Sequence, residues 1–234
     1  MSSRSLILPL VFVGLLVIGA LAWKSVPSPK PSPSPSAMPP LAIDKLPVAV
    51  TTRKFDPAAP PAEMPRLGAH ETAECDSNFL SSASVRGITH NIDATHATLT
   101  ITNVRMTLQL KINLWLPNEA AQNLIDHEEG HRQISENTYD TADKLAERIA
   151  SAYIGKQIEI TGPDLEGASD KTLQQLATEI TTVYGKELNP DPPQLLYDSI
   201  TQHSRNNILA KDAVNYALKN VAIESPNSPS TTGN

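Results

Sequence analysis

A long alternation of apolar and polar residues constrains the fold of this chain more than any other feature. Across residues 104–116 every second side chain is apolar, and Pro117 follows directly. A period of two places alternate side chains on opposite faces of a β-strand, and proline cannot continue a central strand. We therefore expect a long half-buried strand that ends at Pro117. Residues 96–102 alternate in the same way, and Asn103 predicts a turn that joins the two runs as an antiparallel hairpin.

The segment after this strand has the periodicity of an amphipathic helix. Over residues 118–153, apolar or small side chains recur every three or four positions, and charged side chains occupy the opposite face. The apolar stripe comprises Leu124, Ile134, Thr138, Ala142, Leu145, Ile149 and Ala152. We expect the helix to pack this stripe against the hairpin.

The elements after the long helix are shorter. Residues 157–160 predict a strand, Gly162 and Pro163 a turn, and residues 169–188 a helix with Ser169 as its N-cap. The proline-rich stretch 189–193 breaks the chain, and a last helix is expected to start near Pro193. The sequence thus predicts an α+β domain, in which an antiparallel hairpin or sheet packs against the long helix and two further helices.

The first residues of the chain predict export. Residues 5–23 form an apolar run between Arg4 and Lys24, which is typical of a signal peptide or a signal anchor. Residues 1–24 are therefore expected to lead the rest of the chain out of the cytoplasm, with Arg4 on the cytoplasmic side. We expect a cell-envelope protein: a periplasmic domain anchored to the inner membrane by this N-terminal helix, or a secreted domain if the signal is cleaved.

A proline-rich stretch follows the apolar run. Residues 25–66 contain most of the 20 prolines of the chain, and this composition predicts a semi-rigid spacer with extended polyproline geometry. Residues 67–225 are long enough to form a single hydrophobic core, whereas residues 226–234 are expected to be a disordered tail.

Charge and cysteine content exclude some partners and cross-links. The net charge is -6, and no cluster of basic residues lies outside the N-terminus, so nucleic acid is not an expected partner. The single cysteine, Cys75, excludes an internal disulfide.

One short motif carries chemistry. Residues 127–131 read His-Glu-Glu-Gly-His, which is an HExxH motif. On a helix, side chains four residues apart lie one turn above each other, so His127 and His131 can bind the same zinc ion. Glu128 then lies beside a zinc-activated water molecule, whose proton it can accept as general base and pass to a leaving amine. The motif therefore predicts a zinc metallopeptidase.

The helical phase of the motif strengthens this interpretation. At about 100° per residue, His127, Glu128 and His131 fall within the apolar stripe and point inward. Burying three polar side chains without a partner is costly, and a bound metal ion would satisfy all of them. Gly130 costs about 1 kcal/mol inside a helix, which indicates that another element packs closely there.

A catalytic zinc site needs a third protein ligand. Glu136 lies on the opposite side of the helix from His127, and the extended pattern HExxHxxGxxH is absent. His203 has an inward phase in the last predicted helix and is the expected third ligand, with Asp198 and Glu179 as alternatives.

Two motifs together resemble a known family. LIDHEEGHRQI at residues 124–134 and YDSITQH at residues 197–203 are similar to motifs of the DUF922 family of predicted secreted zinc-dependent proteases. In that family a β-rich segment ending in Leu-Pro precedes an HE-x-GH helix, and a YD-x-x-T-x-HG motif follows. The resemblance covers about residues 75–213 and implies that Tyr197, Asp198, Thr201 and His203 belong to the site. Ser204 stands where the family pattern has glycine.

These observations lead to one main hypothesis. The chain is expected to be a membrane-tethered or secreted zinc-dependent peptidase that acts on peptide or protein substrates in the cell envelope, with Zn²⁺ as its cofactor. The expected zinc ligands are His127, His131 and His203. Glu128 would be the general base, while Tyr197 would donate a hydrogen bond to the oxyanion or Asp198 would orient a ligand histidine.

Two alternatives dispense with catalysis. In the first, the chain is a non-catalytic zinc-binding envelope protein, whose structural metal site is closed by four protein ligands. In the second, the domain is an envelope interaction protein with a polar core and no metal. Metal content and an open coordination position distinguish these alternatives from the peptidase.

Overall fold

The computed structural model describes residues 39–68, 71–206 and 208–221 of the 234-residue chain. The expected signal or anchor segment, residues 1–24, and the expected tail, residues 226–234, lie outside these ranges. Within them, no helix combines the length and the apolar character that crossing a membrane requires.

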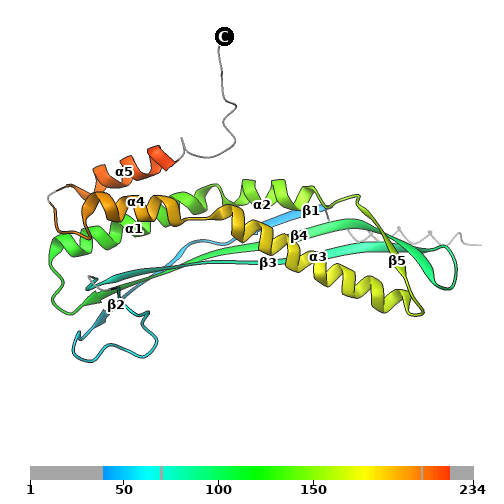
Figure 1. Ribbon diagram of the computed structural model, residues 1–234, viewed down its shortest axis with the longest axis horizontal. Helices are drawn as coiled ribbons and strands as arrows, with labels where there is room; N and C mark the ends of the chain where they lie inside the picture. Colours follow the sequence, from blue (N-terminus) through cyan, green and yellow to red (C-terminus); the bar gives the residue numbers. More distant parts are fainter. Residues whose placement is uncertain (1–38, 69–70, 207, 222–234) are drawn as a thin grey trace, which may run out of the picture. The chain divides into compact units, whose positions relative to one another are not determined.

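A five-stranded sheet is organised around one long strand (Figure 1). That strand is β4 (His96–Pro117), and β3 (Glu74–Asn91) pairs antiparallel with most of its length. Along the other edge of β4, β5 (Gln157–Thr161) pairs antiparallel, whereas β1 (Leu41–Lys45) and β2 (Ala49–Phe55) pair parallel. The second edge of β3 therefore has no partner strand among the described residues.

The expected turn at Asn103 is wrong. The two alternating runs form one continuous strand, and its hairpin partner is the preceding strand, β3. The buried phase shifts by one residue between Ile101 and Val104, and the pairing register shifts opposite this point, between Arg86 and Gly87. A β-bulge absorbs such a shift without ending the strand. The change of phase in the sequence therefore marks a bulge rather than a turn.

The spacer predicted over residues 25–66 includes residues that are folded. Strands β1 and β2 lie within residues 25–66, so the folded part of the chain begins before residue 67. Both strands pair with β4, and Leu41 and Ile43 of β1 pack against the core. Pro47 and Pro57 lie just outside these strands, where proline removes no hydrogen bond of the sheet. These two short strands were not predicted because the sequence around them is rich in proline.

Five helices are described in this part of the chain: α1 (Gln122–Asp140), α2 (Ala142–Ser151), α3 (Leu165–Leu188), α4 (Asp191–Thr201) and α5 (Ala210–Val221). The single helix expected over residues 118–153 is divided at Thr141. Helix α3 starts earlier than expected because the Asp164 side chain, rather than Ser169, caps it by accepting the Gly167 N–H at 2.9 Å. Helix α5 was not predicted.

The expected apolar face of β4 forms the main core. Its alternate side chains from Val104 to Leu116 are all buried, which confirms the predicted strand phase. Those from Val104 to Leu114 pack in a cluster with side chains of α1, α2 and α3 that includes Tyr139, Ala146, Ile149, Ile180 and Tyr184. A second cluster joins α1 to α4 and α5 through Ile134, Tyr197, Ala213, Val214 and Ala217. The mixed α and β architecture is as expected, and α1 is packed between the sheet and α4.

Candidate metal centre

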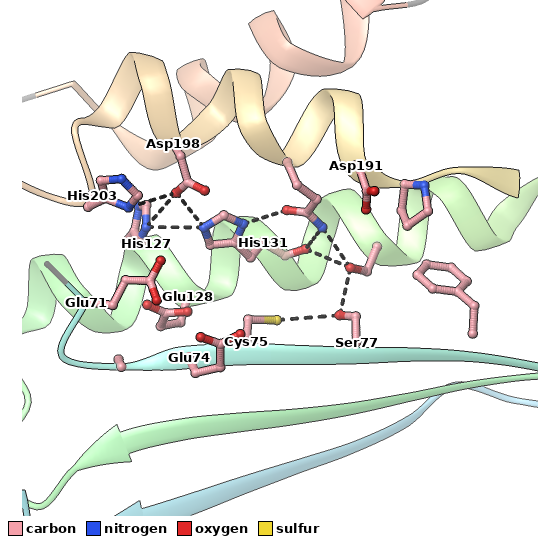
Figure 2. A pocket seen from close by; sticks show the side chains of 15 residues that line it. Glu71, Glu74, Cys75, Ser77, His127, Glu128, His131, Asp191, Asp198 and His203 are labelled. Atoms are coloured by element: carbon pink, nitrogen blue, oxygen red, sulfur yellow. Dashed lines mark hydrogen bonds and ion pairs between the residues drawn. The ribbon is translucent and has the colours of Figure 1, made fainter. Parts of the chain in front are cut away.

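Helices α1 and α4 bring three ligand-type side chains together (Figure 2). His127 and His131 project from successive turns of α1, and Asp198 projects toward them from α4. The Nε2 atoms of the two histidines are 3.2 Å apart. Asp198 Oδ1 lies 2.9 Å from His131 Nε2 and 3.3 Å from His127 Nε2. Three potential ligand atoms thus surround one point.

Hydrogen bonds on the far side of each imidazole ring favour one tautomer. The Thr201 hydroxyl donates to the Tyr197 carbonyl at 2.8 Å, so its oxygen accepts from His127 Nδ1 at 3.3 Å. The Gln194 carbonyl oxygen accepts from His131 Nδ1 at 2.5 Å. Because both Nδ1 atoms act as donors, both Nε2 atoms are left with a lone pair directed at the shared point.

The spacing of these atoms fits a bound metal ion. Bonds of about 2.05 Å in a tetrahedral zinc site place neighbouring ligand atoms about 3.3 Å apart. The three separations here run from 2.9 to 3.3 Å. Two lone pairs and a carboxylate oxygen at such distances repel one another unless a cation or a proton lies between them. The His127–His131–Asp198 group therefore has the donor chemistry of a metal site.

The charge balance of the group agrees with this need for a cation. Burial raises the pKa of Asp198, but hydrogen bonds with His127 and His131 outweigh burial and hold that pKa far below its usual range. Burial lowers the pKa of His131, but contacts with Asp198 and Gln194 raise it overall. Without metal, a proton on His131 can therefore occupy the position between the ligand atoms. A metal ion must displace that proton.

Glu128 lies beside the metal-binding group as a buried carboxylate. Its residue surface is only 5% exposed, which confirms the predicted inward phase, and no described residue donates a hydrogen bond to its side chain. Burial raises the pKa of Glu128 to about 7, against an opposing effect of His131. Nearby Glu74 and Asp198 raise it further. Glu128 is thus poised to exchange a proton near neutral pH.

The group opens into a cleft of about 240 Å³. One wall is the start of β3, including Glu74, Cys75 and Ser77, and the other walls come from α1 and α4 (Figure 2). The start of β3 therefore borders the space in front of the metal-binding group.

Gly130 explains how α4 comes so close to α1. A Cβ at position 130 would overlap the hydroxyl oxygen and Cζ of Tyr197. The predicted close packing at Gly130 is therefore confirmed. Tyr197 is fully buried, donates its hydroxyl to the His127 carbonyl at 3.2 Å and stacks on the His127 ring at a centroid distance of 5.1 Å.

The structure does not favour the oxyanion role that was expected for Tyr197. Its hydroxyl is bonded to the main chain of α1, and its side chain does not line the cleft that contains Glu128. Tyr197 is instead a packing residue that holds His127 in place.

His203 lies at the site, but it does not belong to the compact ligand group. Its Nδ1 is 3.4 Å from Asp198 Oδ1, and its ring centroid is 6.3 Å from that of His127. The close set contains Asp198, which the sequence had suggested only as an alternative ligand. Of the other candidates, Glu179 accepts a hydrogen bond from Tyr153 at 2.8 Å, away from the site, and Glu136 pairs with Arg132 on the outer face of α1.

A hydrogen-bond network behind His131 was missed by the sequence analysis. The Gln194 amide donates to the His131 carbonyl at 3.1 Å and to Ser135 Oγ at 2.9 Å. Ser135 in turn donates to Ser77 Oγ on β3 at 2.8 Å. Gln194 precedes Asp198 by one helical turn, so its position on the same face of α4 was a usable signal.

Comparisons with known proteins do not assign a function to this chain. No protein-family model, no curated protein and no solved structure matches the chain. The chemistry of the site is therefore inferred from its own residues.

Proposed function

We propose that this protein is a zinc-dependent peptidase in which His127, His131 and Asp198 hold the metal. The main support is the set of three converging ligand atoms, spaced 2.9–3.3 Å apart beside a buried carboxylate in an open cleft. Bound zinc supplies a Lewis acid that polarises a peptide carbonyl and makes water nucleophilic near neutral pH. Three protein ligands leave a coordination position free, as a catalytic site requires.

Glu128 is the general base in this proposal. It is held on the same face of α1 as the two histidines, and no hydrogen bond from the described residues engages its carboxylate. A pKa of about 7 suits a group that accepts a proton from water and later returns it to the leaving amine. The zinc ligands and the base therefore come from one helix and one facing residue of α4.

The strand that borders the cleft supports a peptide as the substrate. Strand β3 uses one edge to pair with β4, and the other edge is unpaired in the described part of the chain. The first residues of β3 line the cleft. An extended peptide can add to a free strand edge through main-chain hydrogen bonds, and this binding mode accepts many sequences.

His203 takes over the donor role that was expected for Tyr197. Its side chain is 39% exposed, it lines the cleft, and Asp198 lies 3.4 Å from its Nδ1. In that position the ring would donate a hydrogen bond to the oxygen of a substrate carbonyl, while its contact with Asp198 orients the ring.

The proposed location follows from the sequence. The apolar segment in residues 1–24 supports a membrane-tethered or secreted protein with substrates in the cell envelope. The order of the HEEGH and YDSITQH motifs supports membership of the DUF922 family, and the two motifs lie on the two helices that form the site.

Digestion of a peptide library by the zinc-loaded chain tests the proposed activity. The wild-type chain should cleave, and Glu128→Gln should retain its zinc while cleavage falls by about 100-fold or more. Glu147→Gln is the matched control because Glu147 is an exposed glutamate of α2, far along the chain from the motif. Undiminished cleavage by Glu128→Gln would contradict the mechanism.

The position of His203 also keeps the non-catalytic alternative testable. If its ring turned toward the metal, four protein ligands would close the site, as in a structural zinc module. X-ray absorption of the zinc-loaded chain distinguishes the two cases. The peptidase predicts two histidine ligands and an exchangeable oxygen ligand, whereas three histidine ligands would support the structural module.

A further inference from the structure

The cleft beside the metal-binding group contains an excess of negative charge. Among the described residues, five carboxylate side chains line it, whereas no lysine or arginine does. These carboxylates belong to Glu71, Glu74, Glu128, Asp191 and Asp198. One divalent cation at the metal site would balance only part of this charge.

Apart from the exposed Asp191, two of the carboxylates lack a partner that would explain their position. Asp198 contacts the histidines, and Glu71 accepts the Gly68 N–H at 2.6 Å. In contrast, no described residue donates a hydrogen bond to the side chain of Glu128 or Glu74. Glu128 is 95% buried, given its 5% exposure, and Figure 2 shows its carboxylate directed into the cleft. Burial together with repulsion from Glu71 raises the pKa of Glu74.

Repulsion of this kind is relieved when a positive group enters the cleft. A charge-assisted hydrogen bond to a carboxylate in a partly enclosed site is stronger than one between neutral groups. Glu71 and Glu74 lie on the β3 side of the cleft, across from the histidines and Asp198 (Figure 2). They are therefore placed to contact a substrate rather than the metal.

We infer that the cleft selects peptides that carry a cationic group near the scissile bond, with Glu74 and Glu71 as the recognising carboxylates. This inference rests on the proposed peptidase function and adds its substrate class. The cationic group is an ammonium or guanidinium, supplied by a lysine or arginine side chain or by the free N-terminus of the peptide. Glu128 remains available as base because the cation is held by the other two carboxylates.

Three fluorescence-quenched peptides of otherwise identical sequence test this charge selection. The first has an internal lysine and an acetylated N-terminus, the second has leucine in place of lysine and a free N-terminus, and the third has leucine and an acetylated N-terminus. Leucine suits the neutral peptide because Glu71 also borders an apolar cavity of about 460 Å³ lined by Phe55, Leu67 and Leu124.

The zinc-loaded full-length chain should cleave at least one cationic peptide with a kcat/KM about tenfold above that of the neutral peptide. The first and second peptides show whether the side chain or the terminal amine supplies the charge. The ratio should shrink in Glu74→Gln and Glu71→Gln, and it should also shrink as salt concentration rises. Glu147→Gln removes the same charge outside the cleft and should leave the ratio unchanged.

Rates that agree within twofold for all three peptides would overturn the charge selection, as would a preference that survives both cleft substitutions. If the wild-type chain cleaves none of the peptides, the proposed peptidase function fails instead. In that case, binding of the same three peptides to the zinc-free chain tests the selection directly. Equal dissociation constants would then overturn it.

Discussion

Tyr197 occupies the space in which a side chain of residue 130 would lie. Its hydroxyl and Cζ fall within overlap distance of a Cβ built on Gly130, and the same hydroxyl donates to the carbonyl of His127. Glycine therefore lets α4 approach α1 closely enough for Asp198 to reach the two histidines. Gly130, the fourth residue of the HExxH motif, therefore has a structural role beside the chemical role proposed for the motif.

Gly130→Ala is predicted to destabilise the protein by about 2–3 kcal/mol, because overpacking forces α1 and α4 apart. It should also weaken zinc binding. Gly185→Ala in α3 is the control, since nothing lies within 4 Å of the added Cβ. That substitution should stabilise the protein by up to about 1 kcal/mol through helix propensity. Urea denaturation of both variants measures the difference, and equal effects would contradict the packing argument.

Gln194→Leu is predicted to weaken zinc binding by roughly 10–100-fold, although Gln194 is not a proposed ligand. The substitution removes the acceptor at His131 Nδ1, so the ring loses its fixed tautomer and orientation. Thr201→Val should act in the same direction through His127. Competition with a chromophoric chelator measures both affinities. Unchanged affinity in both variants would show that the two rings need no support from α4.

Ser204→Gly is predicted to stabilise the protein by up to about 1 kcal/mol. Three consecutive residues after α4 have positive φ, and Ser204 has the largest value, 64°. A side chain disfavours this left-handed conformation, whereas glycine adopts it freely. Ser199→Gly within α4 is the control and should destabilise by about 0.5–1 kcal/mol. Thermal denaturation compares them, and a loss of stability in Ser204→Gly would contradict the assignment of strain.

Glu128→Gln is predicted to make the metal-free protein more stable at high pH. Burial raises the pKa of Glu128 from 4.5 to about 7, so folding favours its protonated form. The loss of folding free energy caused by ionising the buried Glu128 carboxylate is absent below pH 4.5. It grows as the pH rises and is complete above about pH 7. In chelator, the variant should exceed wild type by about 1–3 kcal/mol at pH 8 and by much less at pH 4.5.

Urea denaturation at both pH values measures this gain. Glu147→Gln, which alters an exposed carboxylate, should show no comparable gain. If the stability difference between Glu128→Gln and wild type were the same at both pH values, the claim that ionised Glu128 destabilises the fold would be contradicted. A gain at pH 8 would show that the chain keeps this carboxylate at the expense of its stability.

Local periodicity predicted the first half of the site correctly. The phase of α1 depends only on residues within a few turns, so the burial of His127 and Glu128 could be predicted from the apolar stripe. The close contact at Gly130 could be predicted for the same reason. The identity of the contacting residue, Tyr197, could not, because it depends on how two distant helices cross.

The second half of the site depends on where α4 ends. The prediction of His203 as third ligand assumed that helical phase continues through residue 203. Helix α4 ends at Thr201, and Gln202 and His203 turn into the left-handed region with φ near 51° and 52°. His203 thereby leaves the helical face that Asp198 keeps. No glycine marks this turn in the sequence, so the usual signal for the end of a helix was missing.

Zinc affinity of the full-length chain tests the central claim most directly, because it compares the two candidates for the third ligand. Wild type should bind one zinc ion. Loss of a residue that only supports a ligand weakens metal binding by roughly 10–100-fold. Asp198→Ala removes a ligand and should raise the dissociation constant by more than that. His203→Ala should change the dissociation constant by less than about fivefold. Circular dichroism checks that both variants are folded. A larger loss in His203→Ala than in Asp198→Ala, or no zinc binding by the wild-type chain, would contradict the proposed metal centre.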